Sequence, residues 1–332
     1  MLPAVLVGRK SIRRSTGQVA KAGGDAIIKS VPVHVPTSFS SLVSGREAEP
    51  FISGDAWLKL LPGHVEESLT EWDLTVDGDS MHGVCALVVP VRRQDGSAAI
   101  LKLTWPHADA LHEHLALQHW RGRGAVRLLA ANPARWAMLL ERLDSGHDLQ
   151  DVPMDVACTV IGTLLLQLDH EALPQLARLS GRAQGMAQAF ATAPAVIPRR
   201  FVEQARSLLS ELVTDDAIDS RMVDTDLHFR NVLAAERQPW LAIDPKPLAA
   251  DPAFAVTPAL WNRWAEAIAS GDLRRHLRRR LSIICDSAGL DEERARAWSI
   301  VREVQMGLWA VSGDDGDGLT KAITIIKALQ HG

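Results

Sequence analysis

Three polar side chains in a single short stretch have the types and the spacing of a phosphoryl-transfer site. Asp226 comes first, Asn231 follows it, and Asp244 comes after two short apolar runs, 232–235 and 240–243, that flank a polar turn. Two such runs around a turn predict a β-hairpin. Because a hairpin folds back on itself, we expect Asn231, just before its first strand, to lie beside Asp244, just after its second. Asp226 would lie in the loop immediately ahead.

Transfer of a phosphoryl group from ATP needs this combination of side chains. Asp and Asn oxygens are ligands for Mg²⁺, which neutralises the charge of the triphosphate. A further carboxylate must orient the acceptor hydroxyl and accept its proton. The spacing Asp226-Leu227-x-x-x-Asn231 matches the D-L-x-x-x-N pattern of a kinase catalytic loop, and Asp244 matches the metal-binding Asp beyond it. We therefore expect Asp226 to be the catalytic base, and Asn231 and Asp244 to bind Mg²⁺.

The segment "DLHFRNVLAAERQPWLAIDPKPLAADPAF", which begins at Asp226, resembles the active-site segment of the aminoglycoside and hydroxyurea phosphotransferases. The resemblance extends over residues 32–330 and includes "RGRGAVRLLAANPARWAMLLERL" at 121–143. It implies the protein-kinase-like fold, an α+β fold with a β-rich N-lobe and a mainly helical C-lobe. It also implies an ATP- and Mg²⁺-dependent antibiotic resistance kinase that phosphorylates a hydroxyl of a small molecule. The acceptor would be a streptomycin-like aminoglycoside or hydroxyurea.

Two positions depart from the family's pattern. Asp224-Thr225 stands where the family commonly has His-Gly before the catalytic Asp, and Ala255 stands where it has an Asp that braces the catalytic loop. These departures leave open a pseudokinase, a nucleotide-binding or scaffold module without turnover. A metal-dependent hydrolase is a further alternative, because Asp224, Asp226 and His228 alternate and would share one face of a strand.

A kinase also needs a lysine on a strand to hold the phosphates and a glutamate on a helix to hold the lysine. Lys102 lies in an apolar run, where a buried ammonium is costly unless it is paired. Glu113 lies on the next predicted helix, on one face with Leu117 and Trp120. If that face packs on the sheet, Glu113 can pair with Lys102 and direct its ammonium to the nucleotide.

Three more nucleotide contacts are expected from their place in the chain. Gly83 ends the segment 77–83, which fills the place of the phosphate-covering turn between the first two strands without having the G-x-G-x-x-G pattern. Glu141 and Leu143 stand at the end of the last strand before the helical half. By the resemblance, they form the hinge whose backbone would meet the adenine.

The elements that must position these residues change character along the chain. The first half favours a helix at 55–71, broken or kinked by Pro62-Gly63, and a helix at 108–121, among strands at 72–76, 84–91, 98–104, 126–130 and 136–142. The second half favours helices at 154–170, 175–191, 199–213 and from 258 to the end, interrupted by a strand region at 221–244. We therefore predict an α+β protein of two lobes. A nucleotide-binding lobe would span 32–143, and a lobe with the catalytic hairpin and the acceptor site would span 144–332.

Composition excludes several other classes of protein. The 332 residues carry a net charge of −4 with a pI of about 6.3, which argues against a nucleic-acid partner. No apolar stretch approaches the ~20 residues of a membrane span. The three cysteines form no CxxC pair, which favours a reducing cytoplasm over a disulfide framework or a structural zinc site. Residues 1–31 are basic and show no core pattern, so we expect a disordered leader, with a targeting segment as the alternative.

Overall fold

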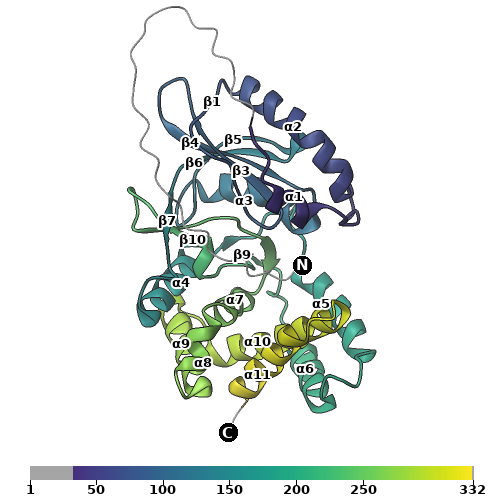
Figure 1. Ribbon diagram of the computed structural model, residues 1–332. Coiled ribbons are helices and arrows are strands. Elements are labelled where there is room, and N and C mark those ends of the chain that lie inside the picture. The colour runs from purple at the N-terminus through teal and green to yellow at the C-terminus, as the bar shows by residue number, and fades with distance from the viewer. Residues whose placement is uncertain (1–32, 331–332) are drawn as a thin grey trace, which may run out of the picture. The chain divides into compact units, whose positions relative to one another are not determined.

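The computed structural model describes residues 33–330, which divide into two compact units (Figure 1). The first unit comprises the chain up to Ala108 together with Leu129–Arg142, and the second comprises Asp109–Leu128 together with the chain from Leu143. Residues 1–31, the expected leader, lie outside the described residues. Asp109–Leu128, which the sequence analysis assigned to the nucleotide-binding lobe, belongs to the second unit.

The first unit is an antiparallel sheet with two helices. The strands lie in the order β1-β3-β4-β6-β5, and β2 also pairs with β3. Asp95-Gly96 turns the chain between β3 and β4, where Gly96 takes the left-handed conformation at φ 78°. The elements are α1 (Thr37–Val43), α2 (Gly54–Glu71), β1 (Thr75–Val76), β2 (Met81–His82), β3 (Ala86–Arg92), β4 (Ala98–Thr104), β5 (Leu128–Asn132) and β6 (Ala137–Glu141).

The core of this unit lies between α2 and the sheet. Trp57, Leu61 and Val65 recur at helical spacing, and all three are buried in one cluster with side chains of β3 and β4. Of the break or kink expected at Pro62, the break is wrong, since α2 continues through this residue. Pro62 lies on the exposed side of the helix, while the buried residues before and after it keep the helix on the sheet. Packing therefore outweighs the backbone hydrogen bond that a proline removes.

The second unit is mainly helical and carries two small antiparallel sheets. One has the order β11-β10-β7 and the other the order β12-β9-β8. β7, β8 and β12 were not predicted from the sequence. The elements are α3 (Glu113–Trp120), β7 (Asp144–Asp148), α4 (Met154–Leu168), β8 (His170–Glu171), α5 (Leu179–Ala191), α6 (Arg199–Leu212), β9 (Arg221–Asp224), β10 (Val232–Ala234), β11 (Trp240–Ala242), β12 (Pro247–Ala250), α7 (Pro258–Trp261), α8 (Trp264–Ala269), α9 (Leu273–Ala288), α10 (Glu292–Ser312) and α11 (Gly316–Leu329).

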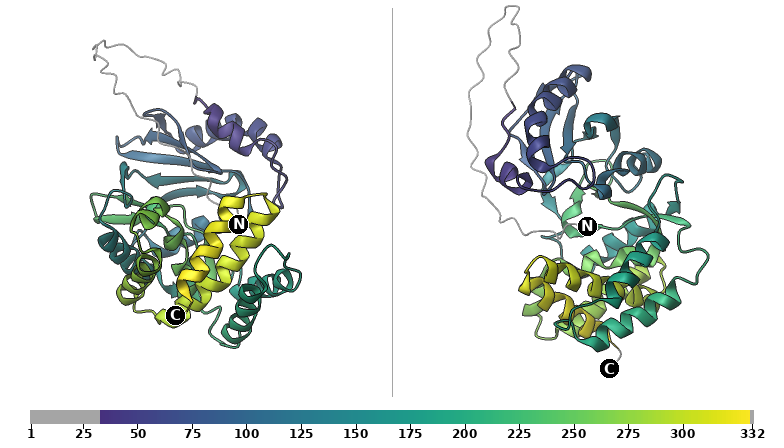
Figure 2. Two further views of the ribbon diagram at one scale, coloured as in Figure 1. Left: turned by 60° about the horizontal axis from the view of Figure 1, so that its bottom comes forward. Right: turned by 90° about the vertical axis from the view of Figure 1, so that its right-hand side faces the viewer.

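Local signals fix where the last three helices begin. Asp272, Asp291 and Asp315 precede α9, α10 and α11, and each side chain accepts a backbone N–H from the first turn. α10 and α11 then run side by side (Figure 2). Gly162 of α4 allows α9 to approach closely, because a Cβ at that position would lie 2.5 Å from the carbonyl oxygen of Ile284. The predicted α+β fold, a β-rich first part and a mainly helical second part, is confirmed.

None of the helices within residues 33–330 combines the length and the apolar character that crossing a membrane requires.

Candidate active site

The predicted hairpin is confirmed as β10 and β11. Val232 pairs with Ala242, and the carbonyl of Asn231 accepts the N–H of Ile243 at 2.8 Å. The strand ends therefore bring Asn231 and Asp244 together from opposite sides of the turn. Asp244 is exposed and has a φ of 53°, a left-handed conformation that Asp tolerates better than most residues. The local sequence has thus placed two oxygen-bearing side chains at one end of a small sheet.

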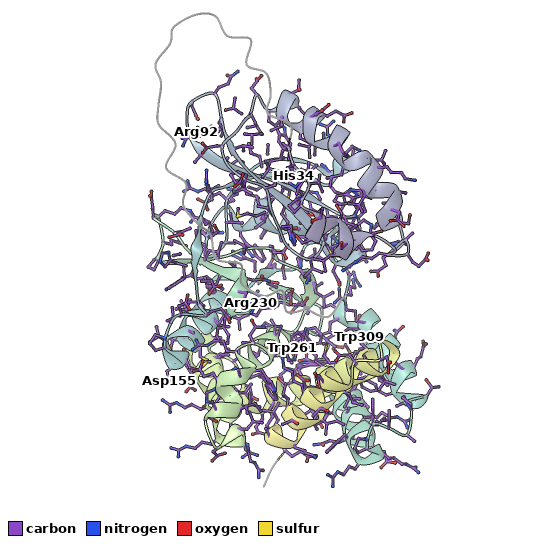
Figure 3. All side chains as sticks on the ribbon, viewed as in Figure 1. His34, Arg92, Asp155, Arg230, Trp261 and Trp309 are labelled. Atoms are coloured by element: carbon purple, nitrogen blue, oxygen red, sulfur yellow. The ribbon has the colours of Figure 1, made fainter. Side chains whose placement is uncertain are left out.

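Asn231 also ties this pair to the predicted base. Its side-chain nitrogen donates to the backbone carbonyl of Asp226 at 3.1 Å, which leaves the amide oxygen as the atom suited to a metal. Mg²⁺ in kinases is held by one or two protein oxygens together with substrate phosphates and water. The amide oxygen of Asn231 and the carboxylate of Asp244 fit that requirement. Arg230, labelled in Figure 3, is exposed, whereas Asn231 is half-buried.

Lys246, which the sequence analysis did not single out, forms an ion pair with Asp226. Its side chain is 22% exposed and that of Asp226 is 13% exposed. Burial works against the ammonium, but the carboxylates of Asp226 and Asp244 more than offset it and raise the pKa of Lys246. The sequence offered one sign of its importance: Lys246 lies two residues beyond Asp244, the predicted metal ligand, in the segment that resembles the family.

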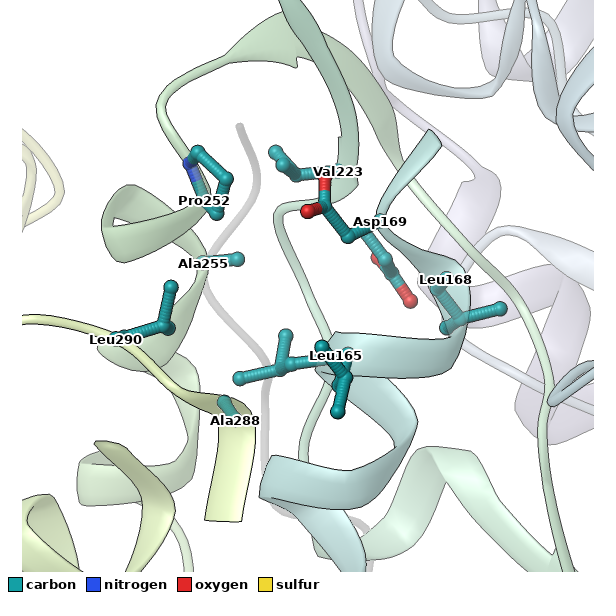
Figure 4. A pocket seen from close by; sticks show the side chains of 10 residues that line it. Leu165, Leu168, Asp169, Val223, Pro252, Ala255, Ala288 and Leu290 are labelled. Atoms are coloured by element: carbon teal, nitrogen blue, oxygen red, sulfur yellow. The ribbon is translucent and has the colours of Figure 1, made fainter. Parts of the chain in front are cut away.

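Asp224 positions both members of that ion pair. One of its carboxylate oxygens accepts the backbone N–H of Asp226 and the backbone N–H of Lys246, each at 3.0 Å. Asp224 is 1% exposed, and burial raises its pKa to about 7. Among the described residues its other oxygen has no hydrogen-bond partner. Asp224 and Ala255 both line a cavity of about 20 Å³ (Figure 4), which has room for one water molecule.

Arg302 of α10 is the second support of the catalytic segment. Its guanidinium donates to the carbonyl of Thr225 at 3.0 Å and to the carbonyl of Phe254 at 2.8 Å. It also stacks on the rings of Phe254 and Trp261, 4.4 and 5.2 Å from their centroids; Trp261 is labelled in Figure 3. Burial lowers the pKa of Arg302 to about 10. The loop is thus held by Asp224 and Arg302, although position 255 is an alanine.

The alternating residues of the hydrolase alternative do not form a metal cluster. His228 is buried, and burial lowers its pKa. One oxygen of Asp224 is already occupied by two backbone amides. Over residues 33–330 there is no group of three His, Cys, Asp or Glu side chains that could hold a metal ion. A site built from Asp224, Asp226 and His228 is therefore absent from the part of the chain that the structure describes.

Lys102 and Glu113, the predicted nucleotide-binding pair, are both buried. Lys102 lies in the middle of β4, opposite Val88 and Met138, and is 5% exposed. Glu113 begins α3 and is 2% exposed, and Leu117 and Trp120 on the same helix face are also buried. The predicted face of this helix is therefore confirmed. Lys102 belongs to the first unit and Glu113 to the second, and their pairing stays a prediction.

The other three predicted nucleotide contacts lie at or beyond the ends of strands. Gly83 is exposed and follows β2, a short strand inside the segment expected to be a turn. Its N–H donates to the carbonyl of Ala86 at 2.9 Å. Glu141 ends β6, and Leu143 follows two residues later, at the boundary of the two units. Both side chains are half-buried. Their contact with a nucleotide stays a prediction.

Solved structures with the same fold include two small-molecule kinases. Choline kinase LicA from Streptococcus pneumoniae superposes with a TM-score of 0.55 at 13% identity, covering 81% of this chain and 98% of that one. Aminoglycoside phosphotransferase APH(4)-Ia, in a ternary complex with ADP and hygromycin B, superposes with a TM-score of 0.54 at 14% identity, covering 80% and 99%. The likeness to these structures establishes the protein-kinase-like fold, which is the class of fold to which the chain belongs.

Sequence comparison identifies the family within that class. Residues 71–316 match the model of the aminoglycoside/hydroxyurea antibiotic resistance kinase, and the chain belongs to this family of phosphotransferases. A streptomycin 6-kinase of Streptomyces glaucescens is 40% identical over 283 residues, which cover 83% of this chain and 92% of the relative. A hydroxyurea phosphotransferase of Kitasatospora aureofaciens is 38% identical over 335 residues, which cover 95% and 93%. The resemblance noted from the sequence is confirmed.

Proposed function

We propose that this kinase transfers the γ-phosphoryl group of ATP, with Mg²⁺, to a hydroxyl of a streptomycin-like aminoglycoside or of hydroxyurea. The observation that carries the proposal is the β10–β11 hairpin, which gathers Asp226, Asn231 and Asp244 within one unit. The two relatives named above act on these two acceptors, and the chain is similar to both over most of its length. With ATP as donor, the reaction would take place in the cytoplasm.

Each side chain of the candidate site has a role in the reaction. Asp226 orients the acceptor hydroxyl and accepts its proton as the new oxygen–phosphorus bond forms. Asn231 and Asp244 hold Mg²⁺, which supplies positive charge to the phosphate oxygens when it is bound. Lys102 binds phosphate oxygens and Glu113 orients Lys102. Contacts of the nucleotide with Gly83, Glu141 and Leu143 complete the donor site.

The pseudokinase alternative rests on Asp224 and Ala255, and the structure supports turnover instead. Asp224 holds the backbone of the predicted base, and Arg302 ties the same loop to the segment that contains Ala255. Neither departure removes a carboxylate or amide that the proposed chemistry uses. An active kinase is therefore the function that the site supports best.

A test compares the wild type with Asp226→Asn. Mg²⁺-dependent ATP consumption is measured with streptomycin, other aminoglycosides and hydroxyurea, and the phosphorylated product is identified by mass. We expect turnover with one of these acceptors and a fall in kcat of at least ~100-fold in the variant, the usual scale for a positioned base. Asp216→Asn, which changes an exposed carboxylate of the same unit, serves as the control and should retain activity.

Two outcomes would contradict the proposal. Turnover by Asp226→Asn at the wild-type rate would remove Asp226 from the role of base. A wild-type protein that binds ATP but phosphorylates no member of the panel would favour the nucleotide-binding module over the kinase.

A further inference from the structure

Lys246 lies at the reacting end of the proposed base. Its ammonium is paired with one carboxylate oxygen of Asp226, Oδ2, yet both side chains keep some exposure, 22% for Lys246 and 13% for Asp226. The ion pair is therefore open to a ligand on at least one side. Asp244, proposed to hold Mg²⁺, is close enough to act on the charge of the same ammonium. A cation thus lies among the carboxylates of the catalytic segment.

The backbone of Lys246 is fixed independently of this ion pair. Its N–H donates to Asp224, and its carbonyl accepts both the N–H and the hydroxyl of Thr225, each at 3.0 Å. Beyond it, β12 pairs with β9. The ammonium, in contrast, sits at the end of a flexible four-carbon stem. The main chain is held in place without the ion pair, so the pair is not needed to fix the loop, and the ammonium can change partner.

An ammonium that stayed on Asp226 throughout the reaction would occupy a carboxylate oxygen that the base needs to accept the proton of the acceptor hydroxyl. The acceptor oxygen lies within ~3 Å of a working base, and the attacked phosphorus lies ~3–3.5 Å beyond that oxygen. A cation that starts on the base is therefore within reach of the oxygens of the transferring phosphoryl group.

We propose that Lys246 is a further catalytic residue, whose ammonium leaves Asp226 on substrate binding and binds an oxygen of the transferring phosphoryl group. This inference rests on the proposed function. In the step itself, the acceptor oxygen forms a bond to the γ-phosphorus, the bond from that phosphorus to the oxygen bridging to the β-phosphate breaks, and ADP leaves with the bonding electrons. The acceptor proton goes to Asp226. Lys246 stabilises the phosphoryl oxygens and neither gains nor loses a proton.

The inference predicts a specific loss of affinity for the γ-phosphate. Equilibrium dissociation constants of ADP and of AMP-PNP are measured with Mg²⁺ for the wild type, Asp226→Asn, Lys246→Met and the double variant Asp226→Asn/Lys246→Met. We expect Lys246→Met to reduce the preference for AMP-PNP over ADP by about tenfold or more, the scale of a charge-assisted contact. Asp226→Asn, which releases the ammonium from its carboxylate, should retain or increase the preference, and the double variant should lose it.

Kinetics provide the second readout. Lys246→Met should lower kcat by ~100-fold or more, with a smaller change in the KM of the acceptor, because the contact is strongest when phosphoryl charge develops. Lys246→Arg, which keeps the charge, should recover part of kcat. Lys327→Met, an exposed lysine of α11, is the matched control and should behave as the wild type.

The double variant removes both charges of the ion pair together, so neither Asp226 nor Lys246 is left as a charge without its partner that could prevent folding. If it prefers AMP-PNP as strongly as Asp226→Asn does, Lys246 does not bind the γ-phosphate and the inference is wrong. Unchanged kcat in Lys246→Met with a lowered melting temperature would likewise reduce the pair to a structural role. Both results are distinct from failure of the proposed function, which would appear as a wild type without kinase turnover.

Discussion

At the scale of single residues, one buried carboxylate organises the candidate site. Asp224 accepts the backbone N–H groups of Asp226 and Lys246, so the base and its partner are aligned by the same oxygen. This arrangement buries an acid that would otherwise ionise well below neutral pH. The resulting rise of its pKa to about 7 links the stability of the protein to pH.

Asp224→Asn should therefore change how stability depends on pH. Asp224 titrates at about 7 in the folded protein and near 3.8 when exposed, so between these values the folded state holds a proton that the unfolded chain has lost. The wild-type free energy of unfolding consequently falls as pH rises through this window. Asn keeps an oxygen for both amides and cannot ionise. Between pH 4 and pH 7 the free energy of unfolding of the variant should therefore rise relative to that of the wild type. The difference should reach as much as ~4 kcal/mol, at ~1.4 kcal/mol per pKa unit.

Urea unfolding of both proteins at several pH values between 4 and 8 measures this difference. Burial also raises the pKa of Glu303, to about 8. Glu303 makes stability depend on pH equally in both proteins, so its effect cancels in the difference between them. The charges nearest to Asp224 are Asp226 and Lys246, which act in opposite directions on its pKa. If the free energy of unfolding changes with pH in the same way in the two proteins, Asp224 is not the group that makes stability depend on pH.

At the scale of elements, α10 supports the catalytic segment from a distant part of the chain. Arg302 binds the carbonyls of Thr225 and Phe254 and lies over the rings of Phe254 and Trp261. The planar guanidinium can serve two carbonyls at once, which an ammonium cannot do with the same geometry. The helix therefore holds together the loop before Asp226 and the segment after β12.

Arg302→Met should lower both stability and turnover. The change leaves two buried carbonyls without their donor, which costs about 1–3 kcal/mol for each group, partly offset because the buried charge is also removed. Arg302→Lys should be intermediate, since it keeps the charge but loses the fork of donors. Thermal unfolding and kcat report the two effects.

Arg199→Met on α6 is the matched control for that experiment. The side chain of Arg199 is 90% exposed and pairs only with Glu203 within its own helix, so its loss should change stability by no more than ~0.5 kcal/mol. An Arg302→Met variant as stable and as active as this control would show that α10 does not position the catalytic segment.

At the scale of the whole molecule, the two units carry different parts of the proposed chemistry. The first has its own core between α2 and the sheet and presents Lys102 in the centre of β4. The second contains the catalytic hairpin and the helices that support it. A nucleotide that binds only the folded protein must stabilise it by mass action.

AMP-PNP with Mg²⁺ should therefore raise the free energy of unfolding of the wild type, by ~2.7 kcal/mol at 100 times its Kd. Lys102→Met keeps the length of the side chain in its apolar strand but removes the cation, so the variant should lose most of this gain. Its stability without nucleotide should also fall, because the buried carboxylate of Glu113 would lose its proposed partner. Denaturant unfolding with and without AMP-PNP measures both quantities. Lys59→Met, an exposed lysine of α2, is the control. An undiminished gain in Lys102→Met would remove Lys102 from the nucleotide site.

The sequence by itself determined the predicted hairpin, because the pairing of β10 with β11 that aligns Asn231 and Asp244 is local. Two apolar runs and a turn bring Asn231 beside Asp244, and no distant residue is needed to align the pair. Helical and strand periods likewise located α2, β4 and the buried face of α3. The short strands β8 and β12 were not predicted, because they gain their stability by pairing with β9, which is distant from both in the sequence.

Only the tertiary structure decided what surrounds the predicted base. Arg302 reaches Thr225 across 77 positions of sequence, and Lys246 meets Asp226 across 20. The period of a sequence reports which residues share a face of their own element, but it carries no information on which distant element packs against that face. The ionisation of Asp224 is a second example: the sequence singles it out as a departure from the family's pattern and a candidate metal ligand, but only burial in the folded protein, where β9 pairs with β12, raises its pKa.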